Sequence, residues 1–127
     1  MRRPAQALVE FALAISVFML LVLGTFDLAR AYMAYTVVAN AAREASRYGA
    51  VHVGETDWKP AAVQAGTNLA VGLDPTTLEL TPTTQTIDML PFITVSGNYQ
   101  FHSITPLVGR LLGDPINIHV DTSTLAG

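Results

Sequence analysis

Hydrophobic and polar positions follow three successive patterns along the chain, and the first is a continuous apolar run. Residues 7–26 are apolar or uncharged apart from Glu10, and no residue from Ala12 to Phe26 carries a charge. Twenty helical residues rise about 30 Å, which matches the hydrocarbon thickness of a bilayer. The run therefore predicts a membrane span with one carboxylate near its start.

The second pattern is a stripe of apolar and small residues at steps of three and four, which predicts that the same helix continues as an amphipathic extension over residues 27–49. Small side chains allow a partner to approach the backbone closely. A helix over residues 6–49 is about 66 Å long, so part of it must face lipid or another protein. The helix-packing stripe consists of Leu28, Ala31, Tyr35, Val38, Ala42, Ala45 and Gly49, with Asp27, Arg30, Arg43, Glu44 and Arg47 expected away from it.

The third pattern is typical of a small head domain over residues 50–127. Short segments of alternating apolar residues predict strands, and proline and glycine residues delimit the helices between them. The predicted fold is α+β, with the long N-terminal transmembrane helix continuing into a head in which a short helix packs on a three- to four-stranded antiparallel sheet. The predicted head elements are helices over 61–73 and 105–113 and strands over 77–83, 92–101 and 116–122.

The residues that flank the apolar run predict its orientation. Arg2 and Arg3 precede it, so the positive-inside rule places the N-terminus in the cytoplasm and the head outside, as a single-pass protein of the cytoplasmic membrane. One alternative is a cleavable secretory signal with a small-x-small site at residues 29–31, which the length of the run and the unbroken helical pattern disfavour. Another is a plain anchor in which Glu10 is incidental, since a carboxylate near the end of a span is tolerated.

Composition narrows the classes of partner and chemistry. Only 13% of the residues are charged, against roughly 25% in ordinary soluble domains, and this favours a membrane-associated protein. The net charge of −3 and the lack of a basic run make nucleic acid an unexpected partner. The absence of cysteine excludes disulfides and thiolate metal sites.

No catalytic or metal-binding constellation is recognisable. His52, His102 and His119 are scattered, and each is expected to face solvent or to make an ordinary hydrogen bond. The serines have no paired base at a readable spacing, and no glycine-rich phosphate loop is present. We therefore expect no enzyme, no cofactor, no metal and no small-molecule substrate.

Three blocks of residues carry a resemblance to a known family. They are QALVEFAL at 6–13, DLARAY at 27–32 with AAREASRY at 41–48, and YQF, ITPL and LLG at 99–101, 104–107 and 111–113. With these blocks in this order, the chain resembles the TadE-like pseudopilins and minor pilins of the Tad (tight-adherence) branch of the type IV pilus superfamily. Many relatives carry a proline near the position of Ser16, so its absence predicts a straighter helix here.

The resemblance implies how the N-terminus is processed and what the glutamate does. It implies that a prepilin peptidase cuts between Ala5 and Gln6, where relatives usually have glycine before the cut, and removes the basic leader 1–5. It also implies that Glu10, with the adjacent Phe11, acts in assembly. Physically, Glu10 of one subunit can pair with the new α-amine of Gln6 on a neighbour, which offsets the desolvation of both groups and fixes their axial register.

The resulting hypothesis is a membrane-anchored pilin-like structural subunit of a Tad or type IV-like pilus, with a role in adhesion or secretion. Its expected partners are other pilin or pseudopilin subunits, the pilus assembly platform and the prepilin peptidase. The main alternative is a permanently anchored extracytoplasmic interaction module that never enters a filament, which an absence of cleavage would favour. A third interpretation is an exported soluble protein cut near Ala31.

Overall fold

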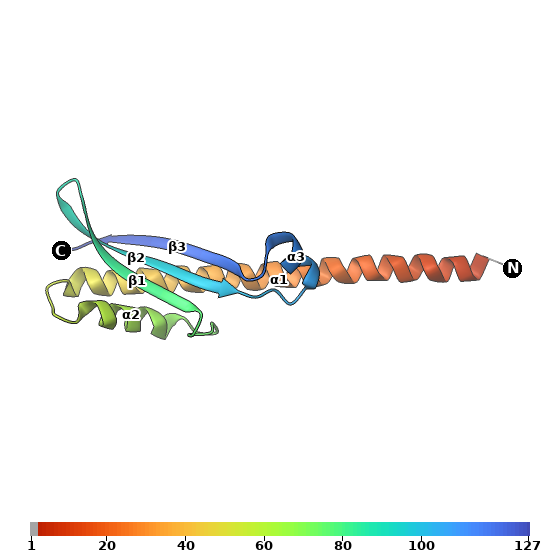
Figure 1. Cartoon of the computed structure of the whole chain (residues 1–127), viewed down its shortest axis with the longest axis horizontal. Helices are drawn as coiled ribbons and strands as arrows, with labels where there is room; N and C mark the ends of the chain where they lie inside the picture. Colours follow the sequence, from red (N-terminus) through yellow and green to blue (C-terminus); the bar gives the residue numbers. More distant parts are fainter. Residues whose placement is uncertain (1–2) are drawn as a thin grey trace.

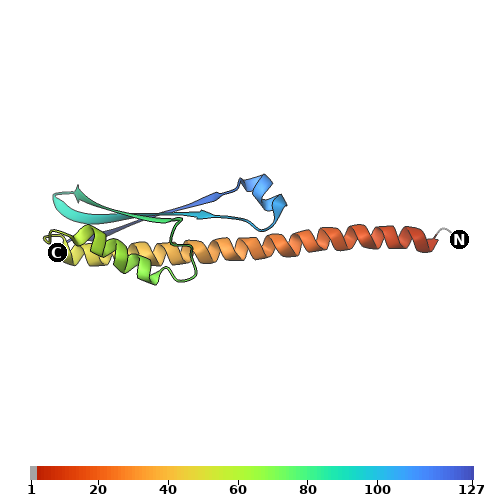
Figure 2. The same cartoon turned by 60° about the horizontal axis from the view of Figure 1, so that its bottom comes forward.

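The computed structural model describes residues 3–127, with side chains from Pro4 onward, and shows an elongated α+β molecule (Figure 1). A single long helix runs from the N-terminal end to the far side of the head. The sheet and the second helix lie along the half of this helix that is distant from the N-terminus, and the third helix lies over its middle (Figure 2). The elements are α1 (Arg3–His52), α2 (Trp58–Leu69), β1 (Leu78–Ile87), β2 (Leu90–Phe101), α3 (Pro106–Leu112) and β3 (Ile116–Leu125).

Helix α1 is uninterrupted over 50 residues, which confirms the long helix expected for residues 6–49. Its sequence is rich in helix formers, and no proline occurs between Gln6 and Trp58. The hydroxyl groups of Ser16 and Thr25 donate to the carbonyl oxygens of Ala12 and Leu21, at 2.7 and 2.8 Å. These bonds satisfy the polar side chains within the helix, as an apolar environment requires.

The sheet has three strands in the order β1-β2-β3, and both pairings are antiparallel. The alternation along β2 turns Ile93, Val95 and Gly97 toward α1, where all three are buried. The opposite face is polar: Thr94 bonds to Ser123 across the pair at 2.8 Å, and His119 bonds to Asn98 at 2.7 Å. One face of the sheet therefore forms the core of the head and the other faces solvent.

Helix α2 packs antiparallel to the end of α1 through very small residues. A Cβ atom on Gly66 would lie 2.6 Å from the Ala41 carbonyl oxygen and 3.0 Å from the Ala45 Cβ, so only glycine permits this approach. At the other end of α2, Trp58 covers Gly49. Helix α2 begins three residues before the predicted range 61–73 and ends four residues before the end of that range. The chain leaves the helical conformation after Leu69, and Gly72 then adopts a φ of +87°, which is outside the helical region.

The head covers only part of the predicted stripe on α1. Val38, Ala42, Ala45 and Gly49 are buried within this chain, whereas Leu28 and Tyr35 are 62% and 48% exposed, so the packing role of those two residues stays a prediction. In their place the head covers Asp27 and Ala34, and Asp27, expected away from the stripe, is only 2% exposed. The reason is that α3 and the ends of β2 and β3 lie over the Asp27–Ala34 side of the helix and leave Leu28 and Tyr35 on its flank.

Candidate assembly helix and its junction with the head

The N-terminal half of α1 presents the residues predicted for cleavage and assembly on an uncovered surface. Ala5, Gln6, Glu10 and Phe11 are all exposed, and none of the apolar window of the helix is buried. Within residues 4–127 the structure shows no ion pair to the Glu10 carboxylate.

The N-terminal and C-terminal parts of the predicted packing stripe have different surroundings. Val38, Ala42 and Ala45 are fully buried in the core of the head, so their small side chains serve contacts within this chain. Leu28 and Tyr35 remain exposed beside the head. The structure does not bring Glu10 together with any of the stripe residues, because a rise of about 27 Å separates Glu10 from Leu28 along the helix.

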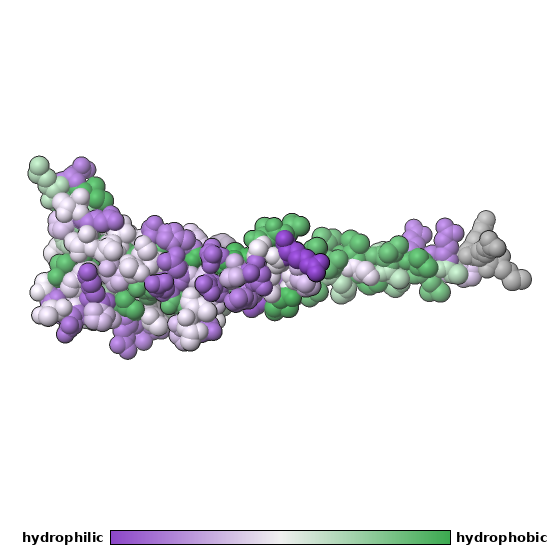
Figure 3. Space-filling model, in the orientation of Figure 1, coloured by the Kyte–Doolittle hydropathy of each residue, from purple (hydrophilic) through white to green (hydrophobic). Residues whose placement is uncertain are grey.

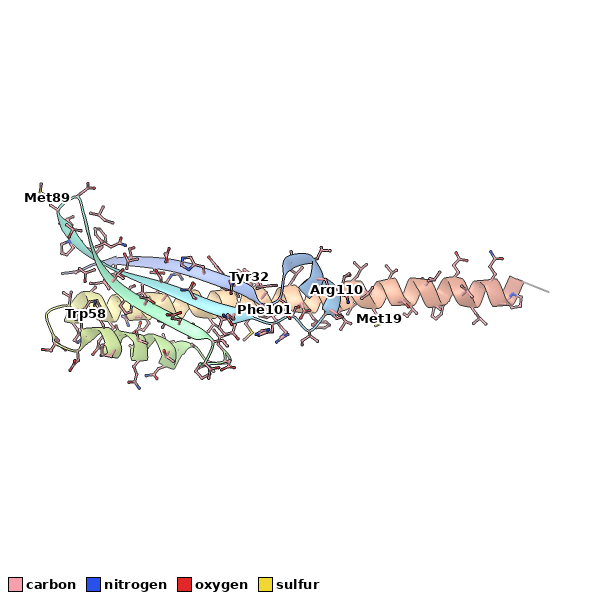
Figure 4. All side chains as sticks on the ribbon, in the orientation of Figure 1. Met19, Tyr32, Trp58, Met89, Phe101 and Arg110 are labelled. Carbon is pink, nitrogen blue, oxygen red and sulfur yellow. The ribbon has the colours of Figure 1, made fainter. Side chains whose placement is uncertain are left out.

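A buried carboxylate joins the long helix to the head at the end of the span. Asp27 accepts a hydrogen bond from the Ile104 N–H at 3.1 Å and another from the Thr105 N–H at 2.7 Å. These two amides belong to the residues that precede α3, so the carboxylate fixes the segment that leads into that helix. The Arg30 guanidinium lies 3.5 Å from the same carboxylate and 5.3 Å from the ring centre of Phe101, which is labelled in Figure 4.

These surroundings lower the pKa of Asp27 below its ordinary value of 3.8. The largest influence is the Thr105 hydroxyl, followed by the Ile104 N–H, while desolvation by burial acts in the opposite direction. The Ile104 and Thr105 N–H groups make the hydrogen bonds to the carboxylate that the geometry supports, whereas the buried Thr105 hydroxyl oxygen has no hydrogen-bond partner within the described residues. Asp27 is therefore held in its charged form.

An apolar groove of ≈ 330 Å³ lies between α1 and α3, directly on the membrane side of Asp27. Five residues of α1 line one wall of it, from Leu20 to Leu28, and the other wall is the apolar side of α3. The contact is close, since a Cβ atom on Gly24 would lie 3.9 Å from a methyl group of Val108. The α3 residues that line the groove are Leu107, Val108, Leu111 and Leu112.

The three histidines have the ordinary environments that were expected for them. His52 bonds to the Tyr48 carbonyl oxygen at 2.9 Å, and His102 lies 3.2 Å from the Asp114 carboxylate. His119 is exposed and bonds to Asn98 and to Asp121. In the part of the chain that the structure describes, no three histidine or carboxylate residues converge in a way that suits a metal ion.

Asp27 is the site residue that the pattern analysis missed. The predicted stripe contains Leu28, three residues before Ala31, whereas Asp27, four residues before it, was expected away from the stripe. A signal was present in the sequence, because an aspartate followed three residues later by Arg30 is a spacing that places both charges on one helix side. The sequence pattern could not predict which distant segment supplies the two N–H donors to this carboxylate.

The N-terminal segment is similar to a known protein family. Residues 5–47 match the family described as TadE-like protein, whereas neither the curated proteins nor the solved structures give a match. The match includes Glu10, Asp27 and Arg30 and ends before the head, so the resemblance of residues 99–113 stays a prediction. One helix, Pro4–His52, is long and apolar enough to cross a membrane. Residues 5–47 are therefore a TadE-like segment, which indicates a membrane-anchored protein associated with Tad pili.

Proposed function

We propose that this protein is a pilin-like structural subunit, a minor pilin or pseudopilin, that assembles through the N-terminal half of α1. The observation that supports this most directly is an apolar half-helix that the head leaves exposed except where α3 lies beside its last turns, with the exposed Glu10 as its only charge between residues 7 and 26. A carboxylate in hydrocarbon is unfavourable without a partner, so the geometry favours an assembly in which another subunit supplies the counter-charge.

The cleavage step supplies that counter-charge. Hydrolysis of the peptide bond between Ala5 and Gln6 leaves a carboxylate on Ala5 and a new α-amine on Gln6, which is one helical turn from Glu10 in the same chain. The scissile bond lies within the first turns of α1. Because the ends of helices fray, a peptidase can reach an extended form of this segment without unfolding the span.

In the cell, the head would lie outside the cytoplasmic membrane and the N-terminus inside, with the subunit passing from the membrane into a pilus that serves adhesion or secretion. The arginines on which this orientation depends, Arg2 and Arg3, have side chains outside the described ones. The proposed role is structural, and the proposed partners are sister pilin-like chains, the assembly platform and the prepilin peptidase.

The test combines processing and assembly in cells that carry Tad pilus machinery. We expect the intact mass of the membrane-extracted protein to show the loss of residues 1–5. The Glu10→Ala variant should insert normally but lose most of its co-purification with sister chains, because the α-amine of a neighbour then has no partner. Ser16→Ala is the matched control, since it removes a polar group from the same span but leaves the charge in place.

Two results would contradict this function. Retention of Met1 in every molecule would favour the permanently anchored interaction module instead. Equal co-purification of Glu10→Ala and the unaltered protein would show that the glutamate has no role in assembly, whatever the state of the N-terminus.

A further inference from the structure

The position of α3 along the long helix fixes its depth relative to a membrane. Residues 7–26 rise about 30 Å, which is the entire hydrocarbon thickness, so a fully inserted span places Phe26 at the edge of the hydrocarbon. The groove residues of α1 begin at Leu20, about 9 Å deeper than Phe26 along the helix. The α1–α3 groove therefore lies at the level of the outer part of one lipid leaflet, on the side of the head.

The side chains that α3 presents outward suit that depth. Leu111 is 79% exposed, and Leu107 and Leu112 are also exposed; Ile104, just before α3, is 71% exposed. In Figure 3 hydrophobic surface covers both the N-terminal half of α1 and the adjacent α3 region, with one hydrophilic group of atoms where the two meet. A cluster of exposed leucines on a seven-residue helix is unfavourable in water, but it is typical of a segment that rests at a membrane interface.

The one cation of α3 has the placement of an interfacial anchor. Arg110, labelled beside α1 in Figure 4, is exposed and makes no ion pair within residues 4–127. A guanidinium on a flexible side chain can extend from the hydrocarbon edge to lipid phosphates. Tyr32, 74% exposed on α1 about 9 Å beyond Phe26, lies where membrane proteins place interfacial aromatic residues.

We propose that α3 is the part of the head that inserts into the membrane. Its leucines and the α1–α3 groove contact lipid acyl chains, and Arg110 binds lipid phosphate. This inference rests on the membrane-anchored helix of the proposed function. It goes beyond that function because it assigns a lipid contact to the head and not only to the span. The occupant is lipid because the groove is continuous with the span and shares its depth.

The experiment places spin labels on single cysteines, since the chain has none of its own. Leu111→Cys reports on α3, Val17→Cys on the centre of the span, and Met89→Cys on the distal hairpin, where Met89 is 95% exposed. The full-length protein is reconstituted in vesicles of phosphatidylethanolamine and phosphatidylglycerol. Electron paramagnetic resonance then measures the accessibility of each label to oxygen, which partitions into lipid, and to a water-soluble nickel chelate. Leu107→Cys gives a second label on α3, and circular dichroism checks that each variant is folded.

We expect the α3 labels to resemble the Val17 label, with oxygen favoured several-fold over the nickel chelate relative to the Met89 label. An α3 label that behaves like the Met89 label, while the Val17 label is in lipid, overturns the inference and leaves the anchor intact. Protection of the α3 labels from both reagents overturns it in favour of a second copy of the chain. A water-exposed Val17 label overturns the anchor and this inference together. Failure of cleavage or of co-assembly, with the α3 labels in lipid, contradicts the pilin role alone.

Discussion

The two halves of α1 form one continuous helix but have opposite surroundings. From Pro4 to Phe26 the side chains are exposed or nearly so, and the sequence is apolar on every side of the helix. From Asp27 to His52 one face is buried under the sheet and α2, and charged residues occupy the other face. A helix that is apolar all round needs an apolar environment, whereas an amphipathic helix is stabilised by its own domain. The first half therefore depends on lipid or other subunits, and the second half on the head.

The packing residues of the two halves differ for the same reason. In the covered half, most of the residues that contact α2 and the sheet are alanines, together with Val38, Ser46 and Gly49, and the backbones approach closely. In the uncovered half, large side chains such as Leu13 and Phe18 project outward. Changing the size of a side chain should therefore have a large effect on the stability of the head when the residue lies in the covered half, and a small effect when it lies in the span.

The largest expected effect comes from shortening a core side chain of the head. Ile93 is completely buried between the sheet and α1, so Ile93→Ala should lower the free energy of unfolding by about 2–5 kcal/mol. The matched variant Ile15→Ala removes the same atoms from the span, where lipid or detergent fills the space, and should change it by less than about 0.5 kcal/mol. Thermal unfolding in detergent, followed through the fluorescence of Trp58, measures both. Equal losses would show that the halves do not differ in this way.

A smaller effect is expected from adding one methyl group where α2 crosses α1. Gly66→Ala places a Cβ atom against the Ala41 carbonyl oxygen, and because backbone cannot move aside easily, we expect a loss of about 1–3 kcal/mol. Gly54→Ala is the control: nothing lies within 4 Å of its Cβ position, so stability should be unchanged or slightly higher. The same unfolding assay applies, and a stable Gly66→Ala variant would contradict the close approach.

The smallest effect on global unfolding is expected at the boundary between the halves. The pKa of Asp27 is lower in the folded protein than its ordinary value of 3.8, so its charged form stabilises the fold above that pH. This stabilisation is lost as the pH falls through the lower, folded pKa. Because the carboxylate holds the segment before α3, we expect loosening of that segment and not of the whole head.

Amide hydrogen exchange measures this local change. At neutral pH the amides of Ile104 and Thr105 should be protected in the unaltered protein and should exchange faster in Asp27→Asn, which lacks the charge. Glu44→Gln is the control, since Glu44 pairs with Arg47 on the exposed side of α1. Unchanged protection of both amides in Asp27→Asn would contradict the role of Asp27 in fixing the segment that leads into α3.

Much of the architecture could be predicted because the relevant patterns are local. The absence of proline and the run of helix formers fix α1, and the alternation of Ile93, Val95 and Gly97 identifies the buried side of β2. Thr105, Pro106 and Gly113 define the limits of α3, which begins and ends where expected. The segment matched to the TadE-like family also lies where the quoted motifs are densest.

The candidate site was predictable only in part. Glu10 is conspicuous because it is a single charge in an apolar run, whereas Asp27 is one of several charged residues on an amphipathic helix. The leucines of α3 were visible as a helix motif, but their exposure beside residues 20–28 was not, because it depends on where the chain returns after the sheet.

The sequence by itself determined the lengths and polarities of the elements, since helix rise, strand alternation and the solvation of apolar side chains act over a few residues. The tertiary structure alone decided which side of α1 is covered. The pattern predicted Leu28 in the stripe and Asp27 away from it, whereas the folded protein buries Asp27, which accepts hydrogen bonds from two backbone N–H groups that are 77 and 78 residues away along the chain. A buried carboxylate is stable only where such donors arrive, and their arrival depends on the folding of the whole head.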